Sequence, residues 1–126
     1  MQSHCRLCQR RVVDERKEAI KADPVLRELN RKSSLKSLRE RQNRLHDIVI
    51  ELKSKPCMDC GGVFHPCAMD FDHREGEEKT DCVARLIAQC RPIEDILAEI
   101  EKCDLVCANC HRIRTYKRTQ LSKEVI

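Results

Sequence analysis

The stretch MDFDHR (residues 69–74) lies between two cysteine pairs, CMDC (57–60) and CANCH (107–111). Cysteine pairs at i, i+3 are typical of tetrahedral zinc sites, and four thiolates complete such a site without leaving an open coordination position. We therefore expect one structural Zn2+ bound by four thiolates, those of Cys57, Cys60, Cys107 and Cys110. The 46 residues between the two pairs exceed an ordinary zinc ribbon, which indicates that other elements are inserted there.

The composition also favours a metal as a stabilising element. The chain has 126 residues, of which 37% are charged and only 2% aromatic, so its apolar core must be thin. Small domains with thin cores usually need disulfides or a metal.

No apolar run follows the first residues, and no stretch approaches the roughly 20 apolar residues of a membrane span. We therefore expect a cytoplasmic protein with no membrane partner, in which the ten cysteines stay reduced and paired thiols favour metal.

Charge is unevenly distributed along the chain. Residues 1–55 carry a net charge of +7, residues 56–106 of −7 and residues 107–126 of +4. Two basic flanks around an acidic middle suit a polyanion held by the flanks while the centre binds metal cations. A charge-rich solvated surface would give the same pattern.

The N-terminal part reads as a helical extension, residues 1–55. We expect helix from residue 12 to about residue 53, with a break at Asp23-Pro24 where Asp23 caps the second segment. An apolar seam with 3-4-3-4-3 spacing runs from Leu35 to Leu52 and should pack on helices of the C-terminal half. A third cysteine pair, Cys5 and Cys8, supplies only two ligands; His4, another cysteine or another chain would have to complete a site. We assign this pair no function.

The sequence of the C-terminal part predicts short strands and helices. We expect a hairpin with arms at 63–64 and 68–71, a helix over 81–90 capped by Asp81, and a helix opened by Pro92. Residues 104–106 should return as a strand or turn before the second cysteine pair. A basic helix is expected from about residue 108 to residue 121.

The residues around the cysteine pairs could form a second, catalytic metal site. Asp72 ends a strand-like run and His111 directly follows the last cysteine, so closing the zinc site fixes the positions of both. A carboxylate and an imidazole suit several divalent metals, which leaves the identity of the metal open. His73 could accept a proton from water near neutral pH. Asp70 shares the face of Asp72 in a regular strand and could support it.

The order of these motifs resembles that of a known family. The chain resembles HNH endonucleases of the ββα-metal (His-Me finger) superfamily over residues 56–118, and its match is closest to phage-associated members with four cysteines. The resemblance is carried by four motifs in sequence order: CxxC at 57–60, DH at 72–73, CxxCH at 107–111 and RIRT at 112–115. It implies the cytoplasm of a bacterial or phage-infected host cell.

The resemblance also implies roles for individual residues. His73 would be the general base that activates water for attack on phosphorus. Asp72 and His111 would hold one divalent ion, Mg2+, Mn2+ or another divalent transition metal, which stabilises the phosphorane-like transition state and the leaving 3′ oxygen. Products would carry 5′-phosphate and 3′-hydroxyl ends. The family's middle Asn is replaced by Asp104, and we favour Asn109 for orienting His73 or the metal loop.

Several basic side chains are candidates for phosphate contacts. Arg114 and Arg118 lie three and seven positions after His111, so on a helix they face the same side as His111. Arg74 and Lys79 lie near the predicted base, His73. Two further arginines lie on the basic face of the N-terminal helix. These six candidates are Arg114 and Arg118, Arg74 and Lys79, and Arg39 and Arg44. For each, an exposed position without a role in binding is the alternative.

Together these features predict a small α+β protein. We expect a zinc-stapled ββα-metal nuclease core with inserted helices at 56–121, preceded by the basic, mainly helical extension. Its function would be metal-dependent hydrolysis of phosphodiester bonds in double-stranded DNA, with one strand nicked per engagement. The sequence favours a monomer over a homodimer. The alternative function is a non-catalytic zinc module that binds DNA or a protein partner.

Overall fold

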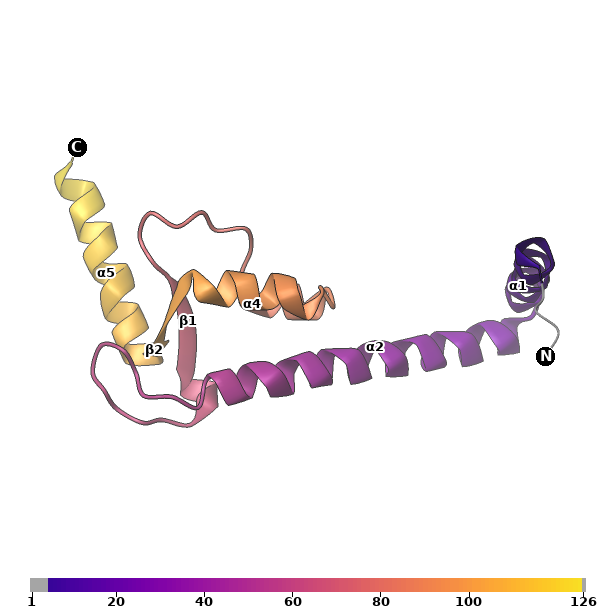
Figure 1. Ribbon diagram of the computed structural model, residues 1–126, viewed down its shortest axis with the longest axis horizontal. Helices are drawn as coiled ribbons and strands as arrows, with labels where there is room; N and C mark the ends of the chain where they lie inside the picture. Colours follow the sequence, from indigo (N-terminus) through magenta and orange to yellow (C-terminus); the bar gives the residue numbers. More distant parts are fainter. Residues whose placement is uncertain (1–4, 126) are drawn as a thin grey trace. The chain divides into compact units, whose positions relative to one another are not determined.

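The computed structural model describes residues 5–125 of the chain, which divides into two compact units, Met1–Glu40 and Arg41–Ile126 (Figure 1). The first unit contains helix α1 (Arg6–Ala22) and the first part of helix α2 (Pro24–Leu52). The predicted break between them is confirmed, because Asp23 Oδ1 accepts the Val25 N–H at 2.8 Å and so caps α2. No residue of α1 is buried.

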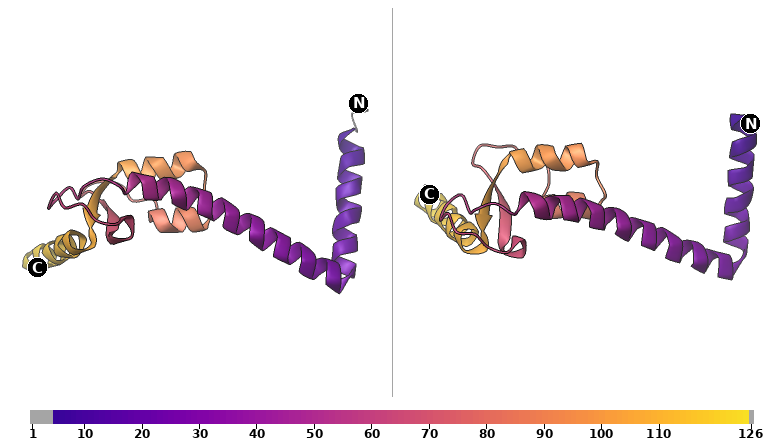
Figure 2. Two further views of the ribbon diagram at one scale, coloured as in Figure 1. Left: turned by 90° about the horizontal axis from the view of Figure 1, so that it is seen from below. Right: turned by 60° about the horizontal axis from the view of Figure 1, so that its bottom comes forward.

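The second unit is α+β and mostly helical, with one two-stranded sheet (Figure 2). It continues α2 and then contains a 3-10 turn, two strands and three helices: η1 (Pro66–Ala68), β1 (Met69–His73), α3 (Val83–Ala88), α4 (Ile93–Glu101), β2 (Cys103–Cys107) and α5 (Ala108–Glu124). Helices α3 and α4 are therefore inserted between the two strands, and α5 follows β2 without a loop. The predicted domain start at residue 56 lies inside this unit, since the end of α2 also belongs to it.

The sheet pairs β1 with β2 in antiparallel register, from Met69 opposite Cys107 to His73 opposite Cys103. The predicted hairpin between 63–64 and 68–71 is wrong. Val63 and Phe64 are exposed and lie outside any strand, and Pro66 begins a 3-10 turn. The partner of β1 is instead the expected return strand near residues 104–106, which the cysteine pairs bring beside it.

Two small clusters form the core of the second unit. One surrounds the strands and contains Cys57, Met69, Leu105, Val106 and Cys107; the other joins α2 to α3 and α4 and contains Val49, Val83, Leu86 and Ile96. Phe71 packs against both clusters. The second cluster confirms the packing on C-terminal helices for the second half of the predicted seam, through Val49 and the adjoining Leu45, whereas Leu35 at its start is 50% exposed. Gln42 Nε2 adds a hydrogen bond to the Ala88 carbonyl at 2.9 Å.

The start of α3 differs from the prediction. The helix begins at Val83, with Cys82 as its N-cap residue and no side-chain cap bond, so the predicted cap by Asp81 is wrong. Asp81 Oδ1 accepts only the N–H of the next residue, Cys82, at 2.8 Å. Pro92 is the N-cap of α4, which confirms the expected start of this helix, and Glu94 and Asp95 lie in its first turn. Within residues 5–125, no helix has the length and apolar character needed to cross a membrane.

Val49→Ala tests the packing of α2 on α3 and α4. Val49 is 4% exposed, so truncation should lower the free energy of unfolding by about 2 kcal/mol through lost burial and a residual cavity. Val25→Ala is the matched control on the same helix, because Val25 is 65% exposed and its truncation should cost less than about 0.5 kcal/mol. Urea unfolding of both variants measures the difference, and equal costs would contradict the packing.

Candidate metal centre and active site

The four cysteines of the two CxxC motifs come together. The Sγ atoms of Cys57, Cys60, Cys107 and Cys110 all lie within 4.8 Å of one another, an arrangement that could hold a metal ion such as zinc. Among residues 5–125, no other group of three or more Cys, His, Asp or Glu side chains has its ligand atoms this close together. Cys57 and Cys107 are buried, whereas Cys60 is exposed.

Backbone N–H groups around the cluster favour the thiolate form. Gly61 has φ of +70°, a conformation that suits glycine, and its N–H donates to the Cys57 carbonyl at 2.9 Å to close the turn. The Cys107 N–H donates to Cys57 Sγ at 3.2 Å. Burial raises the pKa of Cys57, but hydrogen bonds from backbone N–H groups, including those of Cys60 and Cys107, lower it overall to about 6. A thiolate is the form that binds metal.

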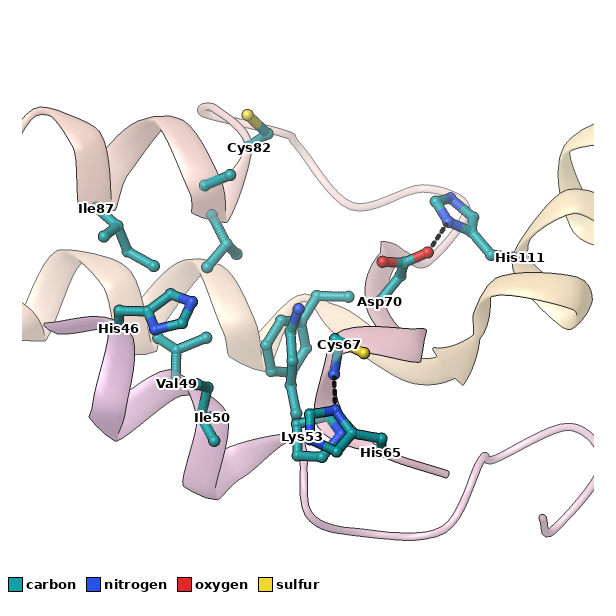
Figure 3. A pocket seen from close by; sticks show the side chains of 14 residues that line it. His46, Val49, Ile50, Lys53, His65, Cys67, Asp70, Cys82, Ile87 and His111 are labelled. Carbon is teal, nitrogen blue, oxygen red and sulfur yellow. Dashed lines mark hydrogen bonds and ion pairs between the residues drawn. The ribbon is translucent and has the colours of Figure 1, made fainter. Parts of the chain in front are cut away.

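His111 lies between two carboxylates of β1. Asp70 and Asp72 are two residues apart on the strand, so both project towards α5. His111 Nδ1 lies 3.0 Å from Asp70 Oδ2, and its Nε2 lies 3.6 Å from Asp72 Oδ1. Figure 3 shows the contact between Asp70 and His111 from the two elements. When Nδ1–H donates to Asp70, Nε2 keeps its lone pair on the side of Asp72, as in carboxylate–histidine–metal arrangements.

Asp72 is a buried carboxylate held by two arginines of α5. It is 5% exposed, and Arg118 binds it through two parallel hydrogen bonds of 2.9 Å each. Arg114 Nη1 adds a third bond at 3.1 Å. Burial alone would raise the pKa of Asp72, but the guanidinium groups of Arg118 and Arg114 lower it, so the carboxylate stays ionised.

Arg114 also offsets repulsion among neighbouring acids. Asp72 and Asp104 are direct partners across the strands, where like charges destabilise the pair. Arg114 Nη1 bridges them, with Asp104 Oδ2 at 3.0 Å, while its Nε and Nη2 bind Asp59 of the first cysteine turn at 2.7 and 2.6 Å. Arg114 thus connects α5 to both strands and to the residues around Cys57.

The imidazole of His73 faces the opposite side of β1. Side chains alternate along a strand, so His73 projects away from the Asp72 side, and its Nε2 lies 2.6 Å from Glu99 Oε1 on α4. Glu99 is 3% exposed and also accepts the Thr80 N–H at 3.1 Å and Lys102 Nζ at 3.0 Å. The sequence analysis assigned no role to any residue of this helix and so missed Glu99. The signal was an acid three positions after the buried Ile96, on the apolar side of α4.

The surroundings of Glu99 keep it ionised. Burial raises the pKa of the Glu99 carboxyl, but hydrogen bonds from His73, Lys102 and the Thr80 N–H lower it overall to about 2. Because a carboxylate only accepts hydrogen bonds, the short contact with His73 requires the proton to sit on Nε2 of the imidazole.

The other predicted residues lie apart from these contacts. Asn109 is exposed at the second position of α5, and no hydrogen bond joins it to His73 within the described part of the chain. Arg74 donates to the carbonyls of Cys103 and Glu101 and contacts Asp104, so it fastens the end of β1 to the chain before β2. The remaining three candidate phosphate ligands are exposed: Lys79, Arg39 and Arg44.

The N-terminal cysteine pair lies at the start of α1. Cys5 is its N-cap, and its Sγ lies 3.0 Å from Cys8 Sγ and accepts the Cys8 N–H at 3.3 Å. The second cysteine pair of the cluster has the same capping contact, with the Cys110 N–H at 3.4 Å from Cys107 Sγ. His4, the neighbour considered as a further ligand, lies outside the described residues.

A cavity of about 600 Å³ opens beside the Asp70–His111 pair (Figure 3). Its walls are mainly apolar and come from α2, η1, β1 and α3, with Val49, Ile50 and Phe71 among the lining residues. His111 and Asp70 lie at its edge, so solvent and small groups can reach the imidazole from this side.

Comparison of the chain with protein-family models, with curated proteins and with solved structures gives no match.

Cys107→Ser tests the four-cysteine cluster. It removes one of four sulfur ligands, so the variant should lose one equivalent of bound metal per chain and unfold at lower temperature. Cys67→Ser is the matched control, because Cys67 is exposed and lies outside the cluster. Metal content by mass spectrometry and thermal unfolding measure the effect; the idea fails if Cys107→Ser keeps its metal.

Acid titration tests the buried carboxylate of Glu99. A carboxyl whose pKa falls on folding stabilises the protein above its ordinary pKa of 4.5, and this stabilisation is lost as the pH falls towards the folded value of about 2. Wild type should therefore exceed Glu99→Gln in unfolding free energy by on the order of 3 kcal/mol at pH 7, and the gap should shrink below about pH 4.5. Both proteins carry the same cysteines, so acid effects on the cluster cancel. A gap independent of pH in urea unfolding would contradict the assignment.

Proposed function

We propose that the protein is a metal-dependent DNA endonuclease of the HNH type, with a ββα-metal core formed by β1, β2 and α5. The observation that carries the proposal is the position of His111 between two carboxylates. Its Nε2 lies 3.6 Å from Asp72 Oδ1, and its Nδ1 lies 3.0 Å from Asp70 Oδ2. This is the donor set and orientation expected for an ion held by Asp72 and His111 and supported by Asp70.

The four-cysteine cluster would hold a structural Zn2+. Four thiolates saturate a tetrahedral zinc, so this ion would have no position for substrate. Its contribution to folding would be on the order of 10 kcal/mol. The two apolar clusters of this unit contain only five and four buried residues. The role of the zinc would be to fix Asp70, Asp72 and His111 in place.

Asp72 and His111 would hold the catalytic divalent ion, Mg2+, Mn2+ or a related metal. Such an ion, when bound, stabilises charge on the phosphate and on the leaving 3′ oxygen. Two protein ligands leave coordination positions for water and phosphate oxygens. His73 would accept the proton of the attacking water. Because its ring lies on the other face of β1, at the last residue of the strand, the DNA would have to pass round this end of the strand to reach both the ion and the imidazole. Asp70 would keep the His111 lone pair directed at the ion.

The arginines of α5 support binding of a phosphate at this site. Arg118 and Arg114 now neutralise Asp72, and a divalent cation would compete with them for the same carboxylate oxygens. Arg118, with 33% of its side chain exposed, would then be free to bind a DNA phosphate next to the ion. Arg114 remains anchored by Asp59 and Asp104, which makes it the less mobile of the two.

The substrate would be double-stranded DNA cut one strand at a time. One metal site per chain serves one phosphodiester, so a monomer would nick. Further phosphate contacts would come from exposed basic side chains, namely Arg39 and Arg44 on α2 and Lys79 in the loop after β1. Such contacts add affinity but do not recognise the base sequence.

Supercoiled plasmid incubated with Mg2+ or Mn2+ tests the proposal. Wild type should convert it to the open-circular form, and His73→Ala should lower the rate by about 10²- to 10⁴-fold, because proton abstraction from water is lost. Glu101→Gln is the control: Glu101 is exposed on α4, lies outside the candidate site and should leave the rate unchanged. Gel electrophoresis of time courses gives the rates.

Two results would end the nuclease proposal: an intact plasmid with wild type under every divalent metal, or cleavage by His73→Ala as fast as wild type. Plasmid bound but uncut would instead favour the alternative of a non-catalytic zinc module that binds DNA.

A further inference from the structure

Glu99 is a buried charge that the cysteine cluster and the metal pair do not use. Burying a carboxylate is costly unless hydrogen bonds and opposite charge compensate it. Glu99 is 3% exposed on α4, whose other buried residue is Ile96. If this position served only for packing, an apolar residue would suit it better. The contacts of the Glu99 carboxylate should therefore explain why a charge is buried here.

The two oxygens of Glu99 have different partners. Oε2 binds Lys102 Nζ at 3.0 Å, which supplies the compensating charge. Oε1 binds His73 Nε2 at 2.6 Å and the Thr80 N–H at 3.1 Å. Lys102 also binds the Glu78 carbonyl and Thr80 Oγ1, so the loop after β1 is fastened to α4 with or without His73. The contact with His73 is therefore additional to the anchoring of the loop.

The contact fixes the tautomer of His73. A carboxylate cannot donate, so the neutral imidazole places its proton on Nε2 and its lone pair on Nδ1. The ring is not fully enclosed, because 16% of the His73 side chain is exposed while Glu99 is covered. Solvent can therefore reach the imidazole but not the carboxylate that orients it.

We propose that Glu99 is a positioning residue that holds the proton of His73 on Nε2, so that Nδ1 is the atom that accepts a proton from water. The inference rests on the proposed nuclease function. In the reaction, the water oxygen forms a bond to phosphorus, its proton moves to His73 Nδ1, and the bond from phosphorus to the 3′ oxygen breaks. The 3′ oxygen takes a proton from solvent, and His73 releases its proton to solvent afterwards. Glu99 stays ionised throughout, as the acid of a Ser-His-Asp triad does.

The tautomer can be measured without any nuclease activity. In 15N-labelled wild type at alkaline pH, two-bond 1H–15N spectra of the His73 ring should show a proton on Nε2 and a lone pair on Nδ1. Glu99→Gln should give a mixture of tautomers, because an amide can donate as well as accept. Glu101→Gln is the matched control: a neighbouring exposed glutamate of α4, whose replacement should leave the spectrum unchanged.

Kinetics then separate positioning from loop anchoring. With plasmid and Mn2+, Glu99→Gln should lower kcat by about 10- to 100-fold with KM for DNA unchanged. Glu99→Asp, which keeps the carboxylate but shortens it by one methylene, should retain more of kcat than Glu99→Gln. Thr80→Val removes a side-chain contact between the loop and Lys102 but leaves both oxygens of Glu99 bonded, and it should keep the Nε2–H tautomer and kcat within about threefold of wild type.

A proton on Nδ1 of His73 in wild type overturns the proposal, as does a Glu99→Gln kcat equal to that of wild type. The spectrum of wild type decides the tautomer even where a variant fails to fold. If wild type shows the Nε2–H tautomer but cuts no DNA, the nuclease proposal and the catalytic part of this inference fail together, while the orientation of His73 by Glu99 stands.

Discussion

The structure depends on the meeting of two cysteine pairs that are far apart in the chain. Cys107 shows how much this meeting controls, because it belongs to several elements at once. It ends β2, pairs with Met69 of β1, caps α5 and lies in the four-sulfur cluster. A metal held by the cluster would therefore fix the strand register and the start of α5 together. The small apolar clusters of this unit would then pack against strands and a helix whose positions the four cysteines already fix.

From this arrangement follows a concentration of charge on one side of β1. Asp70, Asp72 and Asp104 lie close together on two paired strands, which would be unfavourable without cations. Arg114 and Arg118 of α5 supply the positive charge, and His111 contacts Asp70 from the same helix. A set of acids held together by basic side chains is well suited to exchange partners, since a divalent cation can replace a guanidinium at Asp72 and a phosphate can replace Asp72 at the guanidinium. The ion pairs seen here and the proposed binding of metal and DNA thus use the same groups.

The opposite side of β1 has a separate polar network. His73, Glu99, Lys102 and the loop near Thr80 are linked by hydrogen bonds that do not involve α5. Consecutive residues of a strand point to opposite faces, so Asp72 and His73 belong to different networks although they are adjacent in sequence. In the proposed reaction, metal binding and proton transfer are therefore supported by different helices, α5 for the first and α4 for the second. Arg118 Nη2 also donates to the His73 carbonyl at 3.2 Å, so α5 contacts the backbone of the residue whose side chain binds α4.

Local patterns in the sequence determined much of this structure. The break at Asp23-Pro24, the capped start of α2, the start of α4 at Pro92, the helical run after residue 108 and the CxxC pairs all depend on residues a few positions apart, and each was predicted. The Asp72–His111 pairing was also predicted, because both residues adjoin the elements that the cysteines join. Only the tertiary structure decided that β1 pairs with β2 instead of with residues 63–64, that Cys82 and not Asp81 caps α3, and that Glu99 contacts His73. The strand pairing and the contact between Glu99 and His73 join residues 26 or more positions apart, and no local spacing encodes the partner of a strand or of a buried charge.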